Sequence, residues 1–182
     1  MLHRMIVTLI GYRGCGKSSV GPLIAAALNC ECIDSDDRVE AVAGKSIQRI
    51  FAEDGEPVFR QLETDVLRQV YAQSPVVVSA GGGAILAAAN RQMMSSAGPV
   101  VWLRATVDTL AARITGDDSS ATRRPSLTGR SVVDEVADVL EVRTPLYREV
   151  ATLVVDADTQ TPQQIANHVL AELTSLNEGR SL

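Results

Sequence analysis

Short apolar runs alternate with stretches of helical spacing along most of the chain. Residues 5–10, 76–78, 100–103 and 152–155 are apolar runs of strand length, and a shorter candidate follows at 30–33. Between these runs, apolar residues recur at steps of three and four, which predicts helices over 18–28, 57–74, 107–114, 131–147 and 161–173. Strands that alternate with helices in this way predict an α/β fold with a mostly parallel sheet.

Prolines, capping residues and polar residues mark the ends of several segments. Pro57 opens one helix, whereas Pro22 is tolerated only if its helix begins shortly before it. Ser131 and Thr161 have the form of helix-capping residues. Residues 116–130 are almost entirely Gly, Asp, Ser, Thr and Arg, and so long a polar loop in a compact chain predicts a mobile lid.

The composition restricts the class of protein. At 182 residues, with 46% hydrophobic and 21% charged residues, the chain suits a single domain spanning 1–182, without an internal repeat or linker. A net charge of −5 and few aromatic residues argue against a general nucleic-acid surface. No apolar segment approaches the ~18 residues of a membrane span. Three cysteines and an N-terminus without a leader pattern favour the reducing cytoplasm.

A glycine-rich motif follows the first predicted strand. Residues 11–18 match G-x-x-x-x-G-K-[ST] and precede a predicted helix, which is the context that this phosphate-binding loop requires. Its backbone N–H groups would surround phosphate oxygens, Lys17 would reach the outer phosphates, and Ser18 could bind Mg²⁺. The alternative is a glycine turn with a surface lysine. Cys15, inside the loop, is interpreted as a small packing residue.

Two acidic residues follow the second predicted strand. Asp34 and Asp36 lie where the C-terminal ends of strands face the ligand crevice of open α/β sheets. One carboxylate could hold Mg²⁺ or its water, and the other could accept a proton or a hydrogen bond from a substrate hydroxyl. The alternative is a solvated turn or a helix cap. No acidic residue ends the strand at 76–78, which directs attention back to this pair.

The remaining candidates are basic or glycine-rich. Arg60 and Glu63 share a helix face and could form an exposed pair. Residues 79–83 offer backbone amides without obstructing side chains, and Arg143 could bind a carboxylate through two bonds. Arg124 and a second arginine of the lid could close over transferring phosphate charge or remain solvated. The C-x-C pair and two histidines argue against a zinc site, and no Ser/His/Asp triad is arguable.

Taken together, these motifs resemble the shikimate kinases from about residue 5 to about residue 168. The residues that carry the resemblance are 11–19, Asp34 and Asp36, 59–63, 81–83, Arg124 with Pro125, and 143–151. The resemblance implies a three-layer α/β/α sandwich around a five-stranded parallel sheet, the P-loop NTPase fold of the nucleoside monophosphate kinase type. It also implies a monomeric, Mg²⁺-dependent enzyme of chorismate and aromatic amino-acid biosynthesis, which transfers the γ-phosphoryl group of ATP to the 3-hydroxyl of shikimate.

The resemblance further implies roles for individual residues. Catalysis would involve Lys17, Asp36 and Arg124. Shikimate would be bound by a helical segment at about 36–62 and, residue by residue, by Asp36, Arg60, Gly81, Gly82, Gly83 and Arg143. ATP would be held by Gly14, Cys15, Gly16, Lys17, Ser18, Ser19, Arg113 and Arg124. Mg²⁺ would be organised by Ser18 and Asp34.

Other functions fit parts of the pattern. A kinase for another small hydroxy acid, such as gluconate, would share the phosphate-binding loop, but Arg60, residues 81–83 and Arg143 favour shikimate. A nucleotide-binding regulator without transferase activity would not need both Lys17 and Asp36. A GTPase is disfavoured because the chain has no Asn-Lys-x-Asp guanine motif.

Overall fold

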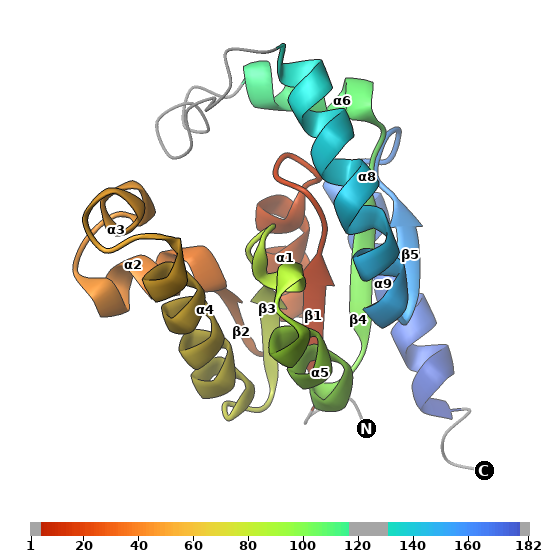
Figure 1. Cartoon of the computed structure of the whole chain (residues 1–182). Helices are drawn as coiled ribbons and strands as arrows, with labels where there is room; N and C mark the ends of the chain where they lie inside the picture. Colours follow the sequence, from red (N-terminus) through yellow and green to blue (C-terminus); the bar gives the residue numbers. More distant parts are fainter. Residues whose placement is uncertain (1–4, 117–130, 179–182) are drawn as a thin grey trace.

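A parallel sheet of five strands forms the centre of the molecule (Figure 1), whose computed structural model describes residues 5–116 and 131–178. The strand order is β2-β3-β1-β4-β5, and each adjacent pair is parallel. The strands are β1 (Ile6–Ile10), β2 (Glu31–Asp34), β3 (Val76–Ser79), β4 (Val100–Arg104) and β5 (Leu153–Asp156). All five predicted strands are therefore confirmed.

Helices cover both faces of the sheet. The alternation of side chains along β1 separates the two cores, because Val7 and Leu9 point to one face while Ile6 and Ile10 point to the other. The first face packs on α1 (Lys17–Leu28) and α9 (Pro162–Glu178). The second packs on α4 (Glu56–Tyr71), α5 (Ala88–Ala97) and α8 (Val132–Val150). The three-layer α/β/α fold is confirmed (Figure 1).

Four further helices stand at the ends and edges of these layers. They are α2 (Ser35–Ala43), α3 (Ile47–Glu53), the 3₁₀ helix η1 (Ala84–Leu86) and α6 (Val107–Thr115). Helices α2 and α3 lie beside α4 (Figure 1). The hydrophobic pattern did not predict α2, α3 or α5, since each of these helices buries only two residues: Ser35 and Val39, Ile47 and Ile50, and Asn90 and Met94.

The helix ends agree with the capping residues read from the sequence. Ser131 accepts a hydrogen bond from the backbone N–H of Asp134, and Thr161 accepts one from that of Gln164. Helix α1 begins at Lys17, so Pro22 lies in its second turn and has no N–H to donate to the carbonyl of Ser18.

The predicted lid falls almost wholly outside the described residues. Only its first residue, Gly116, is described, and it ends α6. Arg124 therefore has no described position. Among the helices of residues 5–116 and 131–178, none combines the length and apolar character needed to cross a membrane.

Candidate active site

The loop between β1 and α1 has the geometry of a phosphate-binding loop. Gly14 and Gly16 have φ angles of 79° and 103°, a region that glycine adopts without strain. Lys17 folds back over the loop, where its Nζ donates hydrogen bonds to the carbonyls of Gly11 at 2.9 Å and Tyr12 at 3.3 Å. The Sγ atom of Cys15 lies 3.7 Å from the same Nζ, and Cys15 is buried, as its packing role predicts. The loop thus holds a cation beside the N-terminus of a helix, a combination that favours anions.

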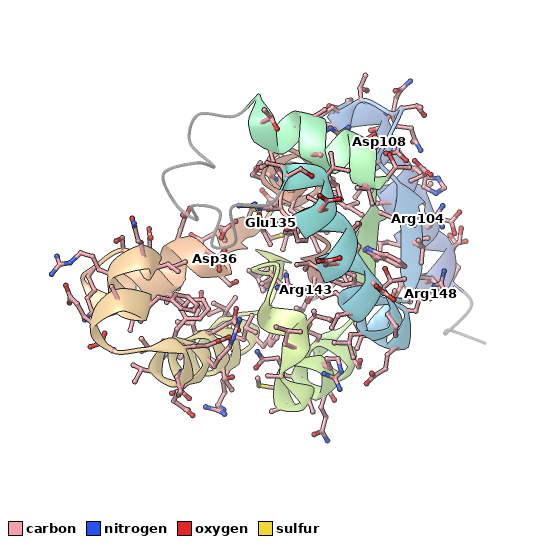
Figure 2. The ribbon with its side chains drawn as sticks, turned by 45° about the horizontal axis from the view of Figure 1, so that its top comes forward. Asp36, Arg104, Asp108, Glu135, Arg143 and Arg148 are labelled. Carbon is pink, nitrogen blue, oxygen red and sulfur yellow. The ribbon has the colours of Figure 1, made fainter. Side chains whose placement is uncertain are left out.

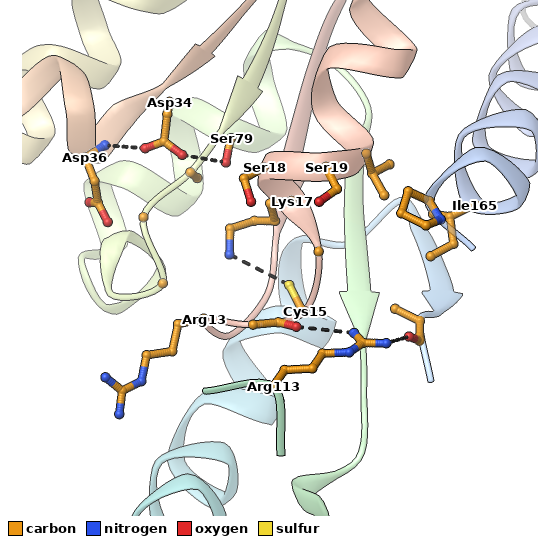
Figure 3. A pocket seen from close by; sticks show the side chains of 18 of the residues that line it. Arg13, Cys15, Lys17, Ser18, Ser19, Asp34, Asp36, Ser79, Arg113 and Ile165 are labelled. Atoms are coloured by element: carbon orange, nitrogen blue, oxygen red, sulfur yellow. Dashed lines mark hydrogen bonds between the residues drawn. The ribbon is translucent and has the colours of Figure 1, made fainter. Parts of the chain in front are cut away.

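A cavity of about 580 Å³ opens over this loop at the C-terminal ends of the strands (Figure 3). Of the predicted residues, it brings together Gly14, Cys15, Gly16, Lys17, Ser18, Ser19, Asp34, Asp36, Gly81, Gly82 and Arg113. Seven further lining residues were not predicted as site residues: Arg13, Val20, Ile47, Ala157, Gln160, Pro162 and Ile165. The cavity therefore joins the phosphate-binding loop to both acidic residues, as the resemblance implies.

Asp34 is both a helix cap and a lining residue of the cavity. One carboxylate oxygen accepts hydrogen bonds from the backbone N–H groups of Asp36 at 2.9 Å and Asp37 at 3.4 Å. The other oxygen accepts one from the Ser79 hydroxyl at 3.0 Å, across the β2–β3 pair (Figure 3). The alternative interpretation as a cap is thus correct for Asp34, and it does not exclude a role in the cavity. These three hydrogen bonds hold the carboxylate in one orientation.

Asp36 lies against the turn that follows β3. The backbone N–H of Gly81 donates a hydrogen bond to the buried Ser35 hydroxyl at 2.8 Å, which ties this turn to the start of α2. A Cβ atom at Gly81 would overlap an oxygen of the Asp36 carboxylate. The absence of a side chain at Gly81 is therefore what allows the carboxylate to sit here.

Arg60 reaches the same turn from α4. A Cβ atom at Gly83 would lie 2.6 Å from one of its guanidinium nitrogens. The guanidinium donates to the carboxylate of Glu56 at 3.0 and 3.1 Å and to that of Glu63 at 3.0 Å. The Glu63 side chain is 1% exposed and that of Arg60 25%, so this contact is a partly buried ion pair and not the exposed pair that the sequence allowed. Glu63 is a functional candidate that the helical spacing alone could not distinguish from a surface residue.

Arg143 approaches the turn from α8. Its guanidinium donates a hydrogen bond of 2.7 Å to the carbonyl of Gly82, and the Tyr147 hydroxyl donates a second to the same oxygen at 3.2 Å. Burial raises the pKa of Tyr147 to about 12, so this hydroxyl keeps its proton at neutral pH. Asp36 on α2 and Arg143 on α8 thus lie on opposite sides of residues 81–83 (Figure 2).

Three of the predicted acceptor residues stand beside the cavity without lining it. Gly83 belongs to the turn at residues 81–83, and Arg60 and Arg143 contact this turn, whose other residues, Gly81 and Gly82, line the cavity. The structure therefore places the residues predicted to bind shikimate around one turn, with Arg60 beside Gly83 and Arg143 beside Gly82.

The opposite end of the cavity is closed by Arg113. Its guanidinium donates to the carbonyl of Gly14 at 3.2 Å and to that of Ala157 at 2.7 Å (Figure 3). It therefore links the phosphate-binding loop to the segment between β5 and α9. Pro162 and Ile165 of α9 supply apolar surface, and the Gln160 amide of the segment before it donates to the carbonyl of Asp156 at 3.0 Å.

The donor atoms for a divalent cation are oxygens. Ser18 and Asp34 both line the cavity, and a hydroxyl with a carboxylate suits the hard cation Mg²⁺. Within the part of the chain that the structure describes, no group of three or more His, Cys, Asp or Glu side chains could hold a metal. The site thus fits Mg²⁺ held by few protein ligands, which is how this cation is usually bound beside substrate phosphates.

Comparison with known proteins identifies close relatives. The family model described as shikimate kinase matches residues 13–174. The shikimate kinase of Rhodopirellula baltica is 46% identical over 162 residues, which cover 89% of this chain and 87% of the relative. Shikimate kinase 2 of Enterobacter sp. is 42% identical, with 92% and 94% covered.

Solved structures agree with the sequence relatives. The shikimate kinase of Acinetobacter baumannii in complex with shikimate superposes with a TM-score of 0.87 at 33% identity, covering 94% of each chain. A gluconokinase from Sinorhizobium meliloti superposes with a TM-score of 0.61 at 24% identity, covering 99% of this chain and 97% of that chain. The likeness to the gluconokinase shows a shared fold only.

Proposed function

Because the chain belongs to the shikimate kinase family, we propose that the cavity described above is where it phosphorylates shikimate. The enzyme is an ATP-dependent phosphotransferase with an alcohol acceptor, and it transfers the γ-phosphoryl group to the 3-hydroxyl of shikimate to give shikimate 3-phosphate and ADP. The observation that carries the assignment is the turn at residues 81–83. Asp36, Arg60 and Arg143 each reach this turn from a different helix, and Gly82 of the turn lies beside the phosphate-binding loop.

The phosphate-binding loop would hold ATP. Its backbone N–H groups and the N-terminus of α1 would bind the phosphates, and Lys17 would leave the carbonyls of Gly11 and Tyr12 to neutralise charge on the transferring group. The end of the cavity that lies between the side chains of Arg113 and Ile165 would receive the adenine ring. The positive charge of Arg124, a residue outside the described ranges, would further neutralise the negative charge of the transferring group.

Mg²⁺ would be bound through the Ser18 hydroxyl, with the Asp34 carboxylate acting directly or through water. The bound ion would neutralise phosphate charge as the γ-phosphoryl group leaves. The chain contributes the orientation of Asp34, whose carboxylate is fixed by Asp36 N–H and by Ser79.

The acceptor would be oriented by charge. Arg60 and Arg143 would bind its carboxylate, since a guanidinium matches a carboxylate in shape and charge. Glu63 holds Arg60 in place from a position buried within the protein. Asp36 would accept a hydrogen bond from the ring hydroxyl and, as that hydroxyl attacks, its proton. Because phosphoryl transfer depends mostly on positioning and charge, the orienting role of Asp36 matters at least as much as its basicity.

A panel of acceptors tests this proposal. ADP release is measured with Mg-ATP and either shikimate or gluconate, because a gluconate kinase shares the fold. We expect turnover with shikimate and little with gluconate; the reverse result would contradict the assignment. Failure to form shikimate 3-phosphate at high enzyme concentration would instead support a nucleotide-binding regulator. The monomeric state, the cytoplasmic location and the lack of a nucleic-acid partner stay predictions from the sequence.

A further inference from the structure

One charged residue of the phosphate-binding loop has no role in the transfer described so far. Arg13 lines the cavity, and its Nε atom is buried although the residue is only partly so. Figure 3 shows its side chain extending away from Arg113, to the lower left of the view, with Asp36 above it. Its guanidinium is therefore directed away from Arg113, which closes the nucleotide end of the cavity.

Arg13 and Arg143 share one aromatic neighbour. The central guanidinium carbon of each lies 5.9 Å from the centroid of the Tyr12 ring. Tyr12 is itself buried, so the ring restrains both side chains.

Gly82 lies between the same two arginines. A Cβ atom at Gly82 would be 3.6 Å from a guanidinium nitrogen of Arg143 and 3.7 Å from the backbone nitrogen of Arg13. Arg13 therefore belongs to the group of residues that meet around the turn at residues 81–83, although it comes from a different loop.

Two guanidinium groups held near one ring repel each other, and a bound anion lowers that repulsion. The acceptor brings a carboxylate to this end of the cavity, whereas Lys17 and the loop amides serve the phosphates. We propose that Arg13 binds the carboxylate of the acceptor together with Arg143 and so helps to select an anionic acceptor. This inference rests on the proposed function, because it presupposes that the acceptor is shikimate.

Comparing shikimate with an uncharged acceptor distinguishes carboxylate binding from the other roles that Arg13 could have. Shikimate and its methyl ester carry the same ring hydroxyls, but only shikimate carries the carboxylate charge. Arg13→Gln should lower kcat/KM for shikimate by roughly 10- to 100-fold, the usual cost of a lost charged hydrogen bond. For the methyl ester we expect a loss of less than about threefold, because a neutral ester forms at most an ordinary hydrogen bond. Arg13→Lys should retain part of the discrimination, since it keeps the charge without the planar fork.

A second arginine variant, on α4, serves as the matched control. Arg68→Gln removes an arginine that is 61% exposed on α4 and should leave both acceptors unaffected. Equal losses on shikimate and its ester would overturn the inference, because Arg13 would then act on the phosphoryl group or on the loop. So would an unchanged kcat/KM for shikimate. If Arg13→Gln does not fold, the same ratio of acceptors is measured with Arg13→Lys, where an unchanged ratio again overturns it. A wild-type enzyme inactive on shikimate would contradict the proposed function itself.

Discussion

Replacing Gly81 with alanine perturbs Asp36 without changing any polar group. A Cβ atom at this position would overlap one carboxylate oxygen of Asp36, and would lie 3.0 Å from the carboxyl carbon and 3.3 Å from the second oxygen. The backbone of Asp36 is held by its hydrogen bond to Asp34, and that of Gly81 by its bond to Ser35, so neither chain segment can move away freely. The carboxylate must therefore rotate or shift.

The geometry sets the magnitude of the effect. Non-bonded heavy atoms prefer separations of roughly 3.5–4.0 Å, so the overlapping oxygen must withdraw by about 1 Å. A displacement of about 1 Å at a reacting group can cost about 100-fold in rate, which corresponds to about 2.7 kcal/mol. Overpacking would also lower the free energy of unfolding by about 1–3 kcal/mol. We therefore expect kcat to fall about 100-fold while the Kd for ATP changes little.

The assay compares two glycine variants by coupled ADP release, ATP binding and urea unfolding. Gly98→Ala serves as the matched control, because its Cβ atom would overlap the carbonyl oxygen of Ile6, at the opposite end of the sheet. Both variants should lose stability, but only Gly81→Ala should lose kcat. A Gly81→Ala enzyme with kcat within about twofold of wild type would refute the argument that Asp36 must stay where it is.

Four other perturbations of the same site have distinct expected outcomes. Asp36→Asn should bind ATP normally in a titration yet lose most of its turnover, and near-normal kcat would remove Asp36 from catalysis. Arg143→Ala should raise the KM for shikimate by roughly 10- to 100-fold and leave that for ATP nearly unchanged, whereas equal effects would contradict carboxylate binding. Glu63→Gln should weaken the hold on Arg60, so steady-state kinetics should show a higher KM for shikimate and thermal unfolding a lower Tm. Burial raises the pKa of Tyr147 to about 12, so the stability that its protonated hydroxyl confers is present below about pH 10 and lost toward pH 12. Urea unfolding should show the free energy of unfolding falling across this range, and Tyr147→Phe should make that fall smaller.

Much of the part of the site that would bind ATP was predictable, because its residues form a local sequence motif. The phosphate-binding motif lies within eight consecutive residues between a strand and a helix, and the structure places Lys17 and Ser18 in the cavity as expected. The apolar strands were predictable for the same reason, since a fully buried strand such as β3 is apolar along nearly its whole length.

The part of the site that would bind shikimate was less predictable, because its contacts join segments that are distant in the sequence. Glu63 and Arg60 have the spacing of an ordinary surface pair, and only the packing of α4 makes the carboxylate buried. Arg13 occupies a variable position of the motif, and its guanidinium lies over the buried ring of Tyr12, while its backbone nitrogen lies beside Gly82. Burial and direction at such positions come from tertiary contacts that helical spacing does not record.

Strand order explains why these segments meet at all. The chain runs from β1 to β2 before it forms β3, but the sheet inserts β3 between them. In a parallel sheet, the residues that follow neighbouring strands emerge side by side at the same edge. The turn after β3 must therefore lie between the phosphate-binding loop, which follows β1, and Asp36, which follows β2. In a sheet with β1 next to β2, the same residues would follow their strands in the same sequence order. The turn that contains Gly81 would then no longer lie between the phosphate-binding loop and Asp36.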